Sequence, residues 1–76
     1  MARRLFAAYE AVSAVVPGEG GYSAAIAVKA LVDGGAPQFH KVLPGQTFST
    51  ASDADEAAER VLAELADVGS EGQLVF

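Results

Sequence analysis

Residues 43–68 read LPGQTFSTASDADEAAERVLAELADV and contain a turn, a helix start and an amphipathic helix in direct succession. Ser52 and Asp53 both suit the N-cap position, because a short side-chain oxygen can accept a hydrogen bond from a backbone N–H that the helix leaves unpaired. Asp53 and Glu56 also have the spacing of a capping box. Gly69 is a typical stop signal. The pattern therefore predicts a helix that begins at residue 52 or 53 and ends before Gly69.

One face of this predicted helix is apolar and the other is acidic. The apolar residues recur at spacings of three and four, which is typical of a buried face; they are Ala54, Ala57, Ala58, Val61, Leu62, Leu65 and Val68. On the charged side we single out Asp55, Glu56, Glu59 and Arg60 as candidate partner-binding residues. Such a face either docks a basic partner protein or is an ordinary solvated surface.

The chain before the helix has the alternating pattern of strands. Residues 22–32, YSAAIAVKALV, place one apolar and one mixed set of side chains on opposite faces, as expected for a sheet with one covered side. Residues 38–43, QFHKVL, predict a short third strand. Turns are predicted at residues 17–21, PGEGG, and at residues 33–37, DGGAP, where glycine and Asp-Gly favour reversals.

Residues 5–16, LFAAYEAVSAVV, fit a helix and a strand almost equally well, because alanine serves either pattern. The glycine-rich turn that follows, and the strand beyond it, favour a hairpin, so a strand is predicted here, and a helix is the alternative.

Residues 73–76 are either a fourth, edge strand or a loose tail. The predicted fold is a single α+β domain over residues 1–76: a three-stranded antiparallel sheet (β-β-β-α) with the helix packed on one face.

Composition limits the classes of function. A chain of 76 residues buries only about 60% of its unfolded surface. It has no cysteine to form disulfides, so we expect oligomerisation, most simply a homodimer, to add stability. A net charge of −5 argues against direct binding of nucleic acid. No apolar run approaches the ~20 residues of a membrane span, so we expect a cytoplasmic protein with no membrane contact.

Residues that carry chemistry are few. His40 is the single histidine, and no sequence neighbour is marked as a nucleophile or as an orienting group for it. The carboxylates near the helix start lack a histidine or cysteine at metal-ligand spacing. The GEGG run at residues 18–21 lacks the Gly-Lys-Ser/Thr ending of a phosphate loop. We therefore predict no catalytic residue, no cofactor, no metal site and no small-molecule ligand, and we expect a protein that is not an enzyme.

Residues 42–65 resemble the corresponding part of HicB-like antitoxin domains, in which a strand ends in Pro-Gly, a threonine-containing loop follows and an acidic-Glu-Ala start opens a helix. The matching positions are Pro44, Gly45, Thr47 and the pair Glu56-Ala57. The loop glycine usual in that family is absent, and residues 69–76 contain no recognisable DNA-binding segment. The resemblance implies an inhibitor that blocks a toxin without binding an operator.

The chain is more similar to short proteobacterial β-β-β-α proteins of unknown function. These share the strand, the Phe-x-Thr loop at residues 48–50 and the alanine-rich helix. That resemblance implies no activity. Together these observations predict a small binding or interaction module that is not an enzyme and associates with itself through a sheet edge or an uncovered sheet face. The alternative is an antitoxin-like inhibitor whose acidic helix masks a basic partner.

Overall fold

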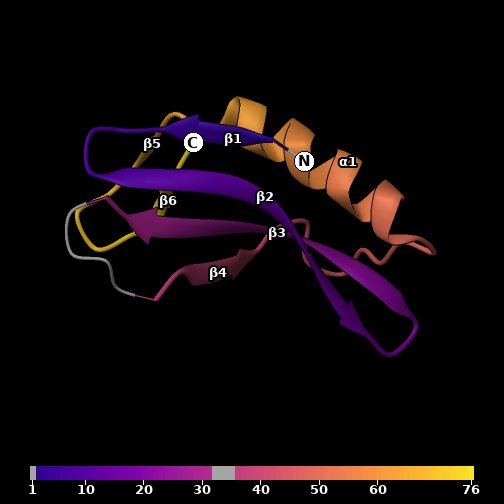
Figure 1. Cartoon of the computed structure of the whole chain (residues 1–76). Helices are drawn as coiled ribbons and strands as arrows, with labels where there is room; N and C mark the ends of the chain where they lie inside the picture. Colours follow the sequence, from indigo (N-terminus) through magenta and orange to yellow (C-terminus); the bar gives the residue numbers. More distant parts are fainter. Residues whose placement is uncertain (1, 32–35) are drawn as a thin grey trace.

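The computed structural model of the protein describes residues 2–31 and 36–76 (Figure 1). The elements in chain order are β1 (Arg3–Leu5), β2 (Tyr9–Gly18), β3 (Gly21–Ala30), β4 (Gln38–Lys41), α1 (Ala51–Glu64), β5 (Asp67–Val68) and β6 (Leu74–Val75). Strands β1 to β4 form an antiparallel sheet in the order β1-β2-β3-β4, and α1 packs against β2 and β3. The predicted α+β fold is confirmed. The predicted turn at residues 33–37 falls largely outside the described residues.

The segment predicted as one strand over residues 5–16 is divided between β1 and β2, so the sheet has one strand more than predicted. The chain reverses at residues 6–8, where the Phe6 N–H donates to the Tyr9 carbonyl at 2.8 Å. The alternative of an N-terminal helix is wrong. A strand forms here instead, because residues 9–18 pair along their whole length with β3.

The turn predicted at residues 17–21 joins β2 to β3, with Gly18 opposite Gly21 and Glu19 and Gly20 at the tip. Gly20 has a φ of +83°, which glycine adopts without steric cost. Gly21 has a φ of +134°, and a Cβ at this position would collide with the Phe48 carbonyl oxygen. That close approach comes from the bridge between Tyr22 and Phe48, whose N–H and C=O groups bond reciprocally at 2.8 Å.

The register assigns the side chains of the sheet to two faces. Ser13 lies opposite Ile26, and Ala11 opposite Val28, on the side that α1 covers. The buried core between sheet and helix consists mainly of small and medium side chains: Ala11, Ala24, Ile26, Val28, Val42, Ala57, Ala58, Leu62, Leu65 and Val68. The alternation predicted for residues 22–32 is confirmed over residues 22–30, whereas Leu31, the last described residue of that segment, lies in a turn.

The ends of α1 differ from the prediction. Thr50, rather than Ser52 or Asp53, is the N-cap, and its Oγ1 accepts from the Asp53 N–H at 3.1 Å. The helix ends before Gly69, as predicted, but already at Glu64 with Leu65 as C-cap, so it does not reach Val68, the last residue assigned to its apolar face. Val68 is buried as predicted, but it belongs to β5.

The C-terminal residues form neither a fourth strand of the main sheet nor a loose tail. Within residues 2–31 and 36–76, β5 and β6 pair only with each other, as a hairpin. This hairpin lies on the helix side of the main sheet, where the Tyr9 hydroxyl donates to the Ser70 carbonyl at 3.0 Å. Gly72 is buried against the Gln38 side chain. The other side of the main sheet is therefore left without a covering element in the described part of the chain.

Candidate functional site

The face of the main sheet opposite α1 is called the open face. The strand register assigns to it Arg3 and Leu5 of β1, Glu10, Val12, Ala14 and Val16 of β2, Ser23, Ala25, Ala27 and Lys29 of β3, and Phe39 and Lys41 of β4. Its centre is apolar and its charges lie toward the margins. Phe39 and Leu5 are each 62% exposed, so large apolar side chains meet solvent on this face.

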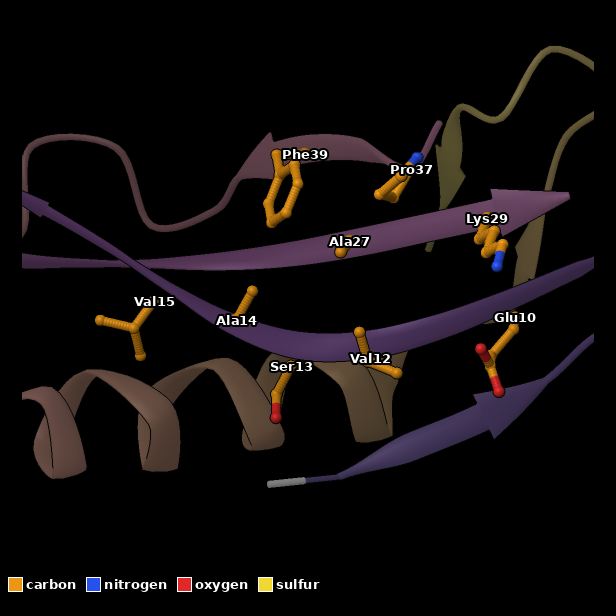
Figure 2. Close-up of a pocket in the computed structure, with 9 residues that line it drawn as sticks. All are labelled: Glu10, Val12, Ser13, Ala14, Val15, Ala27, Lys29, Pro37 and Phe39. Carbon is orange, nitrogen blue, oxygen red and sulfur yellow. The ribbon is translucent and has the colours of Figure 1, made fainter. Parts of the chain in front are cut away.

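A hollow of about 450 Å³ lies in the middle of the open face (Figure 2). Phe39 and Pro37 stand on one side of it, and Val12 and Glu10 stand on the other. Between them β3 contributes the small side chain of Ala27, which is 6% exposed and forms the floor, and Lys29 toward one end. The hollow exists because an alanine lies between two strands that carry larger side chains: Ala27 is opposite both Val12 and Phe39.

Charges of both signs border this hollow. Glu10 lies directly opposite Lys29 in the β2–β3 register, and both residues line the hollow. Glu10 also forms an ion pair with Arg3, in which Oε2 and Nη1 are 3.1 Å apart. The Arg3 side chain is largely exposed, so this pair adds little to stability. Its consequence is to hold the Glu10 carboxylate among basic side chains.

The acidic residues predicted as a docking surface are divided by the structure. Ser13, which is fully buried in β2, donates its hydroxyl to Asp55 Oδ1 at 2.9 Å and accepts from the Ala2 N–H at 2.9 Å. Asp55 therefore takes part in holding the helix on the sheet. Glu59 is half-buried, and Glu56 and Arg60 are exposed.

Burial raises the pKa of the Asp55 carboxyl, whereas hydrogen bonds, first among them the one from Ser13, lower it. The lowering is the larger effect, so the pKa of Asp55 lies below its ordinary value of 3.8. The carboxylate is thus held in its charged form by its contacts with the protein.

His40 lies opposite Ile26 on the helix-facing side of β4 and is half-buried. Its Nε2 atom is buried and has no hydrogen-bond partner among the residues that the structure describes. It borders a second, shallower groove of about 480 Å³, together with apolar residues of the helix and the C-terminal hairpin. No group of three or more potential metal ligands occurs among residues 2–31 and 36–76. Nor does any helix in this part of the chain have the length and apolar character to span a membrane.

Comparison of the chain with protein-family models, with curated proteins and with solved structures gives no match. The resemblances to HicB-like domains and to short β-β-β-α proteins stay predictions.

Sequence reasoning pointed to the helix and missed the hollow. Phe39 was assigned to a strand, and the alternation of that strand separated it correctly from His40. The sequence pattern does not predict the register between strands, which places Phe39 beside Ala27 and Ala27 opposite Val12. Alanine recurs at alternate positions of β3, and the neighbouring strands carry larger side chains. That combination is the sequence signal that could have indicated a groove.

Proposed function

We propose that this protein is a small interaction module that is not an enzyme and associates with a second copy of itself through the open face. The observation that carries the proposal is Phe39, which is 62% exposed above the alanine floor of the hollow. Soluble monomers seldom leave a contiguous apolar patch of large side chains in water, and such patches mark interaction sites. Burying this patch would add hydrophobic stabilisation that the single chain lacks.

The choice of a second copy rests first on the small core. The largest fully buried apolar side chains are Ile26, Leu62, Leu65 and Val28, and much of the remaining core is alanine. Domains of this size gain little stability from one core and commonly gain more by oligomerising. The choice of a second copy rests secondly on charge. A two-fold contact requires a surface that is complementary to itself, and the open face has an acidic residue, Glu10, beside a basic one, Lys29.

The face is a better candidate than the edges of the sheet, which the sequence left as an equal possibility. β1 has only three residues, two of which are arginines, and β4 has four, with Pro37 before it and Lys41 at its end. Short strands, lysine and proline are the usual means by which proteins prevent edge-to-edge pairing.

The test is the mass of the purified protein by sedimentation equilibrium over a wide range of concentration. We expect a reversible dimer, and we expect Val12→Lys, which places a charge in the wall of the hollow, to be monomeric. Ala63→Lys is the matched control, because it adds the same charge at an exposed position of α1 on the other side of the molecule. A wild-type protein that stays monomeric throughout would contradict the proposal, as would equal effects of the two substitutions.

A second candidate function is the antitoxin-like inhibitor, and a segregation of charge favours it. α1 carries Asp53, Asp55, Glu56, Glu59 and Glu64 against Arg60 alone, whereas Arg3, Lys29 and Lys41 lie on the open face. This function requires a basic protein partner. Co-expression with the protein encoded by the neighbouring gene tests it: a complex that dissociates in high salt and is weakened by Glu56→Lys supports this function, and the absence of a complex opposes it.

A further inference from the structure

We infer that the hollow on the open face is a receptor for the Phe39 ring of the second copy, so that each copy completes the site of the other. This inference rests on the proposed function and deepens it by naming the side chain that the hollow takes. The projecting ring and the hollow lie side by side on one face of the chain. A two-fold axis that brings one Phe39 to the facing hollow therefore brings the other Phe39 to the other hollow.

The chemistry of the hollow fits an aromatic ring. Its walls are Val12, Pro37 and the near side of Phe39 itself, and its floor is the methyl group of Ala27. A volume of about 450 Å³ is within the range of small-ligand pockets and leaves room for a side chain. Aromatic pairs at such a contact can pack edge to face, which adds to the gain from burial.

The charged side chains at the margin of the hollow are compatible with an aromatic ring, and they help to orient the second copy. Glu10 and Lys29 lie directly opposite each other at one end of the hollow and are of opposite sign, so a neutral ring can enter beside them without leaving one charge uncompensated. A second copy presents the same two charges in the reverse order, which allows carboxylate and ammonium groups to face each other at the rim.

The experiment uses two substitutions that damage the two halves of the contact separately. Phe39→Ala removes the ring, and with it one wall of the chain's own hollow, but leaves the Ala27 floor and the Val12 and Pro37 walls. Ala27→Leu fills the hollow and leaves the ring. We expect each variant alone to dimerise at least about tenfold more weakly than the wild type, as is usual for a central aromatic contact. Mixing the two variants should restore part of the association, because in one of the two contacts of the heterodimer a native ring meets a hollow that keeps its Ala27 floor and its Val12 and Pro37 walls. In the other contact, the leucine of one variant occupies the space that the missing ring of the other leaves empty.

The result that overturns the inference is a wild-type dimer in which Ala27→Leu associates as tightly as the wild type, or in which the mixed variants form no heterodimer. A monomeric wild type would instead overturn the proposed function itself, so the two failures are distinguishable. Thermal unfolding of each variant checks that it is folded.

A second measurement needs no substitution. In an equal mixture of isotope-labelled and unlabelled wild type, we expect intermolecular NOEs between the Val12 methyl groups and the Phe39 ring. Their absence from a confirmed dimer would overturn the inference.

Discussion

At the scale of single residues, Ser13 is the polar group on which the packing of the helix depends. It is fully buried, and its hydroxyl joins the start of β1 to α1 through the Ala2 N–H and the Asp55 carboxylate. The sequence identified Asp55 as a surface residue because helical periodicity places it beside Glu59. It did not identify the serine, because nothing in a strand pattern indicates which small polar residue will lie opposite a helical carboxylate.

We expect Ser13→Ala to lower the free energy of unfolding by about 1–3 kcal/mol near neutral pH, since it removes two hydrogen bonds of a buried hydroxyl, one to the Asp55 carboxylate and one from the Ala2 N–H. The pKa of Asp55 is lower in the folded protein than its ordinary value of 3.8, so the unfolded chain takes up the proton first as the pH falls. The stability that this contact provides is therefore complete above about pH 3.8 and is lost as the pH falls through the folded pKa.

Chemical denaturation at a series of pH values measures both effects. The wild type should lose more stability than Asp55→Asn between neutral pH and the region below 3.8. Ser70→Ala, at an exposed serine of the C-terminal hairpin, is the control and should change the free energy of unfolding by less than about 0.5 kcal/mol. Parallel pH curves for the wild type and Asp55→Asn would contradict the assigned role.

At the scale of elements, the helix was predictable and its ends were not. The apolar spacing located α1 and most of its buried face correctly, because periodicity is a local property. The start was placed at residues 52–53, but Thr50, Ser52 and Asp53 are all capable caps. Phe48 pairs with Tyr22, a contact distant in sequence that fixes the chain just before the helix, and Thr50 has the extended backbone angles of the N-cap.

The end of the helix has a similar cause. Arg4 of β1 donates through Nη1 to the carbonyl oxygens of Leu62 and Leu65, so a side chain near the N-terminus satisfies the last turn of α1. The following residues then pair in β5 instead of continuing to Gly69. The division of residues 5–16 into β1 and β2 was missed because its turn, at residues 6–8, contains no glycine, proline or asparagine.

The helix start gives a direct test. Thr50→Ala removes the oxygen that accepts from the Asp53 N–H, and we expect it to lower the free energy of unfolding by about 1 kcal/mol. Ser52→Ala is the matched control inside the first turn and should have a clearly smaller effect, because alanine is the better helix former. Urea denaturation followed by circular dichroism measures both variants. A larger loss for Ser52→Ala would place the cap where the sequence alone placed it.

At the scale of the whole molecule, the two layers have opposite characters. The helix layer is acidic and closes the core, whereas the open face is apolar at its centre and bears basic side chains. The alternation along residues 22–30 predicted that the sheet would have two different faces. It could not predict the hollow, because that feature depends on three strands meeting in one register.

Self-association through the open face makes stability depend on protein concentration. Unfolding of a dimer releases two chains, so each tenfold rise in concentration stabilises the dimer by about 1.4 kcal/mol. Because two chains unfold together, the unfolding entropy is doubled and the scale of about 4–8 °C per kcal/mol for a single small domain is halved, which gives a rise of about 3–6 °C in Tm. Val12→Lys should have a lower Tm that does not change with concentration, while Ala63→Lys should follow the wild type. Differential scanning calorimetry over two decades of concentration distinguishes these cases, and a wild-type Tm that is constant over that range would mean that the single chain, with its alanine-rich core, is stable on its own.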